Sequence, residues 1–288
     1  MFKSALKIEL ENRPRKNRYH VISFDWNIID KQNFQMVLTV YNFDKKLLER
    51  LTFGDKLNIE ISENRYCVGN IDSQGNYKPC KTLRLVKEWP QCSTCLGEYI
   101  PDLRYIFEPT EEMRNLPFVD RPHVVYLAFH GSKPKIGLTS ENRVLTRLVE
   151  QGADAYAIIQ RVKNRVDARK SEVAISKKLK IQQRISFDDF VKSLFDDKNP
   201  DRLNSIYMEI NAKLKNGFNL AMENLEFLNG YPLKKLTKKP KLAPLADIHT
   251  GNVVGSKGKY LIYLSDENYY ALNIDTLQGH VIRMTSDE

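Results

Sequence analysis

All four cysteines of this chain lie between residues 67 and 95, and the last two form a Cys-x-x-Cys turn. Zinc prefers four thiolate or imidazole ligands in a tetrahedron, and such a turn presents two sulfurs to one ion with little strain. We therefore predict a structural zinc site formed by Cys67, Cys80, Cys92 and Cys95. Twelve residues separate the first two cysteines, wider than in a double Cys-x-x-Cys knuckle. Two alternatives stay open: disulfide bonds, which the missing signal peptide disfavours, and free reduced thiols.

A second group of residues has the chemistry needed to act on a phosphodiester. A tyrosine can position or deprotonate water, a guanidinium can clamp a phosphate, and a carboxylate can hold Mg²⁺ or Mn²⁺. Tyr126, Arg147 and Glu172 supply these three groups. We predict them as candidate catalytic residues, with Glu172 as the candidate Mg²⁺ or Mn²⁺ ligand.

Short strands and amphipathic helices must position these residues. The apolar runs Val124–Phe129 and Ile136–Thr139 flank a glycine- and proline-containing turn, which predicts a hairpin. An amphipathic helix follows, with Ser140 as a candidate N-cap and Gly152 placed to end it. A third strand is predicted at "AYAIIQRV", and a second helix at "NRVDARKSEVAISKKLK".

Each candidate catalytic residue also has a simpler structural explanation. Tyr126 fits a packed strand aromatic, and Arg147 is spaced to pair with Glu150 on its own helix. Glu172 is spaced to balance Arg169. Glu172 also lies on the less polar face of its helix, where a carboxylate needs a metal, an arginine or a hydroxyl as partner.

Four short motifs resemble those of the GIY-YIG endonuclease superfamily: Val125-Tyr126-Leu127, Lys135-Ile136-Gly137-x-Thr139, Arg147-Leu148 and Glu172. The resemblance spans residues 122–185 and is closest to the branch whose second motif begins with lysine. It implies a β-β-α-β-α core, a nuclease-like site and a polar amide after the glutamate, which the sequence alone does not place. Lys135 stands where active members usually carry a second tyrosine, and a lysine is a poor base unless burial lowers its pKa.

The whole chain is similar to the family catalogued as domain of unknown function 2797. The similarity rests on the order of "CVGN", the later cysteines, "PHVVYLAFHGSKPKIGLT", "RLVEQGADAYAII", "SEVAI" and "GNVVGSKGKYLIY". It implies a common layout over nearly all 288 residues and transfers no mechanism.

Positive charge is concentrated in the middle of the chain. The net charge is +9, and residues 119–185 hold 14 basic against 6 acidic side chains. This favours RNA or DNA as partner, because neutralising phosphates releases counterions; a solvated lysine-rich surface is the alternative. The predicted phosphate contacts are Lys135, Arg143, Arg161, Lys163, Arg165, Arg169 and Lys170.

These patterns predict an α+β protein of four parts. Residues 1–118 are expected to form an N-terminal β domain with the zinc site, and residues 119–185 a GIY-YIG-like domain. Residues 186–241 are expected to form two helices and a basic linker, and residues 242–288 a small C-terminal β module. The chain has no run of about 18 apolar residues and no signal-like N-terminus, so we expect a cytoplasmic protein that does not span a membrane.

The favoured function is binding of RNA or DNA, with a slow or vestigial phosphodiesterase site. An active Mg²⁺- or Mn²⁺-dependent endonuclease and a zinc-containing adaptor that docks on a ribonucleoprotein are the alternatives. Two further features are given ordinary structural roles: His130 as an edge or turn histidine, and "GSKGK" at residues 255–259 as a hairpin turn.

Overall fold

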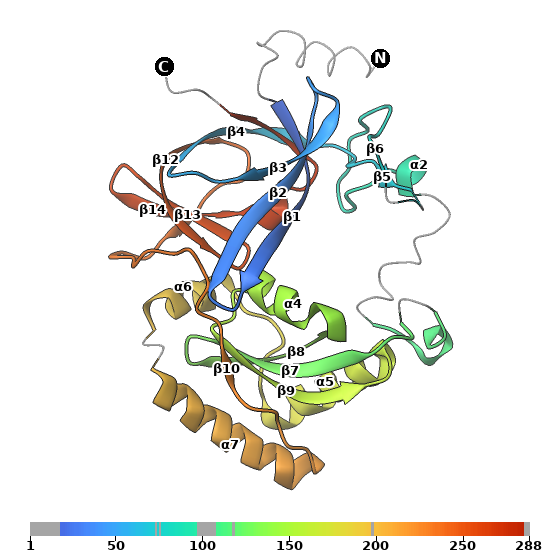
Figure 1. Ribbon diagram of the computed structural model, residues 1–288, viewed down its shortest axis with the longest axis vertical. Coiled ribbons are helices and arrows are strands. Elements are labelled where there is room, and N and C mark those ends of the chain that lie inside the picture. Colours follow the sequence, from blue (N-terminus) through green and yellow to red (C-terminus); the bar gives the residue numbers. More distant parts are fainter. Residues whose placement is uncertain are drawn as a thin grey trace.

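The structure is a computed structural model that describes residues 18–72, 74, 76–96, 108–116, 119–196 and 199–284. It is a mixed α+β protein with a nine-stranded sheet, a four-stranded sheet and a two-stranded ribbon (Figure 1). The predicted α+β class is thereby confirmed. Residues 1–17 and 97–107 of the predicted N-terminal domain, and 285–288 of the predicted C-terminal module, lie outside the described residues. Within the described part of the chain, no helix is both long and apolar enough to cross a bilayer.

The nine-stranded sheet joins the two ends of the chain, and its strand order is β11-β14-β13-β12-β4-β15-β1-β2-β3. Its N-terminal strands are β1 (Arg18–Asp30), β2 (Asn33–Asn42), β3 (Leu47–Thr52) and β4 (Lys56–Arg65). Its C-terminal strands are β11 (Lys241–Leu242), β12 (Ile248–Lys257), β13 (Tyr260–Ser265), β14 (Asn268–Asn273) and β15 (His280–Met284).

The C-terminal strands do not form the separate module that the sequence pattern suggested. Strand β15 lies between β4 and β1, and β12 pairs with the other edge of β4. Without these partners β1 and β4 would each present an unpaired edge, which native sheets avoid. Alternation along each segment predicts a strand but carries no signal for a partner some two hundred residues away. Figure 1 shows the blue N-terminal and red C-terminal strands in one sheet.

The four-stranded sheet has the order β10-β9-β7-β8. The predicted hairpin is formed by β7 (His123–His130) and β8 (Lys133–Ser140), and the predicted third strand is β9 (Ala155–Val162); β10 is Glu226–Phe227. Tyr126 of β7 lies directly opposite Gly137 of β8. Every residue of β7 is buried because both faces of this sheet are covered.

The helices lie where the sequence patterns predict them, but Ser140 is not the N-cap expected, because its side chain makes no capping hydrogen bond and a 3-10 turn separates it from the helix that follows. After a 3-10 turn, η2 (Glu141–Arg143), helix α4 (Val144–Gln151) ends at Gly152, whose φ of 76° is the left-handed conformation that glycine adopts without strain. Helix α5 (Arg165–Leu179) is capped by Asn164, whose side chain accepts from the backbone N–H of Asp167 at 2.9 Å. The predicted helical segment forms α6 (Phe187–Phe195) and α7 (Pro200–Phe218).

The four-stranded sheet is the middle layer of the molecule (Figure 1). One of its faces shares a core with α4 and the nine-stranded sheet, including Tyr126, Leu148 and Leu38. Its other face packs on α5 and α7 through residues such as Leu127, Ile175 and Leu214. The alternation of strand β7 therefore sends Tyr126 toward the nine-stranded sheet.

A buried ion pair joins the two sheets. Lys257 Nζ contacts the two carboxylate oxygens of Asp154 at 2.8 and 2.7 Å, and both side chains are at most 2% exposed. The neighbouring Trp26 indole donates to the carbonyl oxygen of Gly258 at 2.9 Å. A Cβ on Gly258 would lie 2.9 Å from the Gly152 nitrogen, so the two glycines allow their backbones to touch. The predicted hairpin turn in residues 255–259 is thus also a junction between the sheets.

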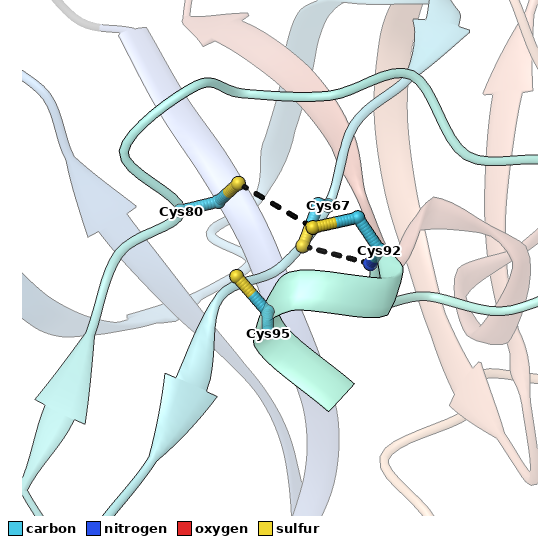
Figure 2. Close-up of side chains that lie close together, drawn as sticks. All are labelled: Cys67, Cys80, Cys92 and Cys95. Carbon is cyan, nitrogen blue, oxygen red and sulfur yellow. Dashed lines mark hydrogen bonds between the residues drawn. The ribbon is translucent and has the colours of Figure 1, made fainter. Parts of the chain in front are cut away.

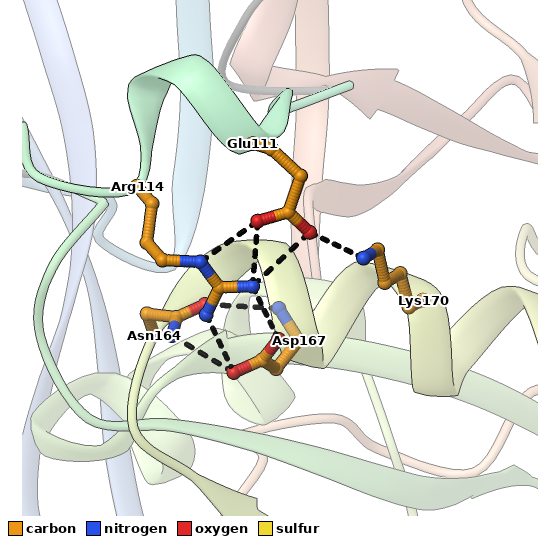
Figure 3. A network of polar contacts seen from close by, with 5 residues as sticks. All are labelled: Glu111, Arg114, Asn164, Asp167 and Lys170. Atoms are coloured by element: carbon orange, nitrogen blue, oxygen red, sulfur yellow. Dashed lines mark hydrogen bonds and ion pairs between the residues drawn. The ribbon is translucent and has the colours of Figure 1, made fainter.

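The end of the predicted proline-containing linker is docked on α5 (Figure 3). The 3-10 helix η1 (Glu111–Met113) precedes Arg114, which donates to both carboxylate oxygens of Asp167 at 2.9 Å and also pairs with Glu111. Lys170 makes an ion pair with the same Glu111. Part of the positive charge on α5 is therefore neutralised within the protein.

Candidate metal centre and basic cleft

The four cysteines converge beside the two-stranded ribbon of β5 (Asn70–Ile71) and β6 (Tyr77–Lys78), with Cys95 on the short helix α2 (Ser93–Leu96) (Figure 2). All four sulfurs lie within 4.8 Å of one another, and those of Cys80 and Cys92 are 4.0 Å apart. No disulfide links them. Cys67, Cys80 and Cys92 are buried and Cys95 is partly exposed.

This geometry fits a tetrahedral metal ion. Four sulfurs about 2.3 Å from one zinc ion lie about 3.8 Å from each other, close to the observed separation. The Cys67 sulfur also accepts from the backbone N–H groups of Cys92 at 3.1 Å and Gly69 at 3.5 Å, contacts that favour a thiolate. Gly69 has a φ of 80°, and a Cβ there would lie 2.3 Å from the carbonyl oxygen of Lys78. The predicted clustering of the cysteines is therefore confirmed, and they can hold a metal ion.

The three predicted catalytic residues line one cleft with a volume of about 600 Å³. Tyr126 comes from β7, Arg147 from α4 and Glu172 from α5. The cleft is rich in charge. Its basic lining residues are Lys135, Arg147, Arg165, Arg169, Arg184 and Lys259. Its acidic lining residues are Glu108, Glu150, Glu172 and Asp275.

Gln151 links Tyr126 to Lys135 at the inner part of the cleft. The Tyr126 hydroxyl donates to Gln151 Oε1 at 3.1 Å, and Lys135 Nζ donates to the same oxygen. Lys135 Nζ also lies 5.8 Å from the centre of the Tyr126 ring. Opposite Tyr126, Gly137 leaves room for the ring, because a Cβ there would lie 2.5 Å from the tyrosine hydroxyl oxygen. A steric requirement therefore explains the glycine of the second motif: a larger residue at position 137 would clash with the Tyr126 side chain.

Burial shifts both of these ionisable groups. It raises the pKa of Tyr126 to about 12, against the opposing charge of Arg147. Burial, reinforced by the charge of Arg147, lowers the pKa of Lys135 to about 8, although Glu172 opposes this. Near neutral pH the lysine is therefore the more available proton acceptor of the two, because about a tenth of it is already neutral at pH 7.

Glu172 is held by an arginine, as one of the simpler explanations predicted. Arg169 Nη1 contacts Glu172 Oε2 at 2.7 Å and Gln183 Oε1 at 2.9 Å. Glu172 is only 6% exposed, so this ion pair satisfies a buried carboxylate. Gln183 lines the same cleft.

Arg147 and Arg143 share one carboxylate but differ in position. Arg147 Nη1 lies 3.2 Å from Glu150 Oε2, the predicted pair, and Arg143 Nη2 lies 2.8 Å from Glu150 Oε1. Both arginine side chains are about half exposed. Arg147 lines the cleft, whereas Arg143 is outside its lining.

The predicted phosphate contacts divide into two groups. Lys135, Arg165 and Arg169 line the cleft. Among the described residues, the other four lie outside that lining: Arg143, Arg161, Lys163 and Lys170. Arg161 pairs with Glu141 and Glu223, and Lys170 with Glu111. The local charge count did not reveal these pairs, because Glu111 and Glu223 lie outside the counted segment and a count does not show that Arg161 meets Glu141.

A protein-family model matches residues 54–282, which is most of the chain, and its description is "Protein of unknown function (DUF2797)". The chain belongs to the DUF2797 family. Searches of curated proteins and of solved structures returned no significant match. The family assignment confirms the resemblance over residues 54–282 and supplies no activity.

In this DUF2797 protein, several residues that line the cleft could not be predicted from the sequence motifs. Gln151 follows the helix motif, and Phe24, Lys259 and Asp275 come from the nine-stranded sheet or its connections. Their approach to Tyr126 depends on how the two sheets pack, which local patterns do not encode. Glycine and lysine in "GSKGK" were the one available signal for Lys259.

His130 also lines the cleft of this DUF2797 protein. It is 1% exposed, and neither ring nitrogen makes a well-formed hydrogen bond among the described residues. Burial, followed by the charges of Lys257 and Lys135, lowers its pKa to about 3, so the ring is neutral near pH 7. It ends strand β7 beside the hairpin turn, as the expected edge or turn histidine would, and it is buried there.

Proposed function

We propose that this protein binds nucleic acid through phosphates held in the basic cleft. The observation that carries the proposal is the lining: Tyr126, Arg147 and Glu172, far apart in sequence, meet in one cavity with further basic residues. Six basic against four acidic side chains favour an anion there. Guanidinium groups bind phosphate oxygens in pairs, and RNA or DNA offers repeated phosphates.

The arginines are suited to phosphate binding because their positions are restrained. Arg169 is held by Glu172 and Gln183, and Arg147 by Glu150. A restrained guanidinium loses less side-chain entropy when a phosphate binds. These carboxylates also reduce the local charge, so a divalent cation or a rearranged ion pair would accompany tight binding.

A fluorescence anisotropy titration tests the proposal. For a nucleic-acid ligand, log affinity should fall linearly as log salt rises. Arg147→Gln should weaken binding about five- to tenfold and reduce the salt slope by about one. Arg143→Gln is the matched control, since it removes the same charge and the same Glu150 contact outside the cleft. Equal effects of the two variants, or binding that does not respond to salt, would contradict the proposal.

A residual phosphodiesterase activity is the second part of the proposal. In it, Lys135 takes a proton from water, which its pKa of about 8 makes feasible at slightly alkaline pH. Arg147 and Arg169 offset negative charge on the phosphate, and Gln151 orients the lysine amine. Glu172 would hold Mg²⁺ or Mn²⁺, since magnesium sites often use one or two protein carboxylates together with substrate phosphates. That metal would neutralise phosphate charge.

Cleavage assays distinguish this activity from binding alone. Glu172→Ala should abolish divalent-dependent cleavage and leave affinity nearly unchanged, because in this proposal the arginines bind the phosphate and Glu172 holds only the metal. Cleavage that survives this substitution would remove Glu172 from the mechanism. The full endonuclease alternative predicts turnover that rises with pH between about 7 and 9 as Lys135 loses its proton.

We propose that the metal of the cysteine cluster is zinc and that its role is structural. The four thiol groups satisfy the coordination of zinc without an open position for water or substrate. Metal analysis of purified protein should give about one zinc per chain, and a result below half an equivalent would reject the site.

The adaptor alternative is favoured by one observation. Near the cysteines, three large apolar side chains are well exposed: Ile71 at 61%, Leu85 at 61% and Trp89 at 43%. Exposed apolar residues of this kind can contact a protein partner. The adaptor function would be favoured if the protein bound a ribonucleoprotein with an affinity that does not fall as salt rises, and if Trp89→Ala abolished this binding.

A further inference from the structure

The cleft has a second wall, which comes from the nine-stranded sheet. The same cavity as the candidate catalytic residues is lined by Phe24 of β1, by Lys259 in the turn before β13, by Tyr260 at the start of β13, and by Asp275 of the 3-10 helix η3 (Ile274–Leu277). A ligand that reaches Tyr126 must therefore fit between two sheets. The shape of the cleft limits which forms of nucleic acid can enter.

This second wall is fixed firmly to the first. The buried Lys257–Asp154 ion pair lies two residues from Lys259, and the backbone of Gly258 packs against that of Gly152 at the end of α4. Breaking a buried ion pair on one side costs several kcal/mol, on the order of 3–5. Widening the cleft by separating the sheets would disrupt these contacts, so we treat its width as set by the fold.

Apart from Arg147, whose side chain is about half exposed, the groups proposed to act on the phosphate lie deep in this cleft. Tyr126 is fully buried, and Lys135 and Glu172 are 5% and 6% exposed. A double helix is stiff and carries its phosphates on the outside, so it cannot follow a path between two fixed walls. A single strand is flexible and much thinner. A cavity of about 600 Å³ holds a ligand of drug-like size, which corresponds to roughly one or two nucleotides.

Aromatic and polar groups in the cleft match an unpaired base. Phe24 is partly exposed and Tyr260 packs on Phe190 with ring centres 4.4 Å apart. Base stacking on aromatic rings is how proteins bind single strands without regard to sequence. His130, deep in the same cavity, has ring nitrogens without well-formed hydrogen bonds, and such buried polar atoms call for a partner.

We infer that the cleft accepts a single-stranded segment of RNA or DNA, with a phosphate among the arginines and an adjacent base against Phe24. The inference rests on the proposed function and adds the form of its substrate. Lys259 on the opposite wall contacts the next phosphate. Duplex nucleic acid binds only weakly, through contacts on the outer surface.

The test compares four labelled oligonucleotides of about 12 nucleotides in fluorescence anisotropy titrations with the full-length protein. They are single-stranded RNA, single-stranded DNA and the two matching duplexes. Single strands should bind at least tenfold more tightly than duplexes of the same sequence. If single-stranded RNA and DNA bind with different affinities, the tighter one identifies the class of natural ligand. If their affinities are equal, the site contacts only the phosphates and bases and does not distinguish the sugars.

Phe24→Leu keeps the apolar volume and removes the aromatic face. It should weaken single-strand binding about 5- to 150-fold without changing the salt slope. Phe53→Leu is the matched control, because Phe53 packs on the same core as Phe24 but lines a different cavity. Lys259→Gln should reduce the salt slope by about one. Circular dichroism of each variant verifies that the fold is retained.

Three outcomes overturn the inference. If duplexes bind as tightly as single strands and Arg147→Gln weakens both, the single-strand requirement is wrong, whereas the proposed function still holds. Equal effects of Phe24→Leu and Phe53→Leu remove the stacking role. Salt-dependent binding to none of the four ligands refutes the proposed function and the inference together.

Discussion

The buried ion pair between Lys257 and Asp154 gives the sharpest stability prediction. Asparagine at position 154 keeps the size of the side chain and an oxygen that can accept from the Gly131 N–H, now donated to Asp154 at 2.8 Å. It removes only the negative charge. Lys257, which is fully buried, is then left with a positive charge that has lost its carboxylate.

The expected loss follows from the burial of the pair. Removing one partner of a buried ion pair costs about 3–5 kcal/mol. If Lys257 instead releases its proton, the cost at pH 7 is about 5 kcal/mol, because a free lysine amine holds its proton until about pH 10.4. Both routes give a similar value. Domains have total stabilities of about 5–15 kcal/mol, so the substitution should remove a large share.

Urea unfolding at pH 7, followed by circular dichroism, measures this loss. The double variant Asp154→Asn, Lys257→Met should recover most of the stability, because it removes the unpartnered charge. Glu209→Gln is the control, since its partner Lys213 is more than half exposed and the pair should contribute under about 0.5 kcal/mol. A loss below about 1 kcal/mol for Asp154→Asn, or a double variant no more stable than the single one, would refute the reasoning.

Three further predictions concern the cleft and the cysteines. Gly137→Ala should destabilise the protein by about 1–3 kcal/mol in the same assay, because the new Cβ would lie 2.5 Å from the Tyr126 hydroxyl oxygen. Gly54→Ala is the control and should not destabilise the protein in this way, because the space around Gly54 is open. Similar losses of stability in the two variants would disprove the steric account. Cys92→Ser should remove most of the bound metal and lower the melting temperature, and full metal content in that variant would exclude Cys92 as a ligand. The pKa of Lys135 is lowered from 10.5 to about 8 in the folded state, so the unfolded chain binds more protons between these values and stability rises with pH there. Lys135→Met should lose this rise, and an unchanged pH dependence would contradict it.

The secondary structure of the central region could be predicted from the sequence because its signals are local. Two apolar runs around a glycine- and proline-containing turn marked the hairpin of β7 and β8, and glycine at position 152 marked the end of α4. The sequence also indicated that Tyr126 and Glu172 belong together, through motifs within 50 residues of each other. The four cysteines were grouped correctly for the same reason, since only a short segment separates them.

The arrangement of the two sheets could not be predicted in this way. Whether β15 pairs with β1 and β4 depends on hydrogen bonds between segments at opposite ends of the chain, and many strands share the same alternating pattern. The charge count overestimated the basic surface, because Arg161 and Lys170 find carboxylates on other segments. Pairing of this kind is decided by packing, not by local composition.

The chemical types in the cleft and the elements that carry them follow from the amino-acid sequence, because side-chain chemistry and helix or strand period are properties of short segments. That Gln151 joins Tyr126 to Lys135, and that Phe24 and Lys259 line the opposite wall, depends on how the folded chain packs. These contacts arise from burying the apolar faces of two sheets against α4, which fixes the distances between residues that are remote along the chain.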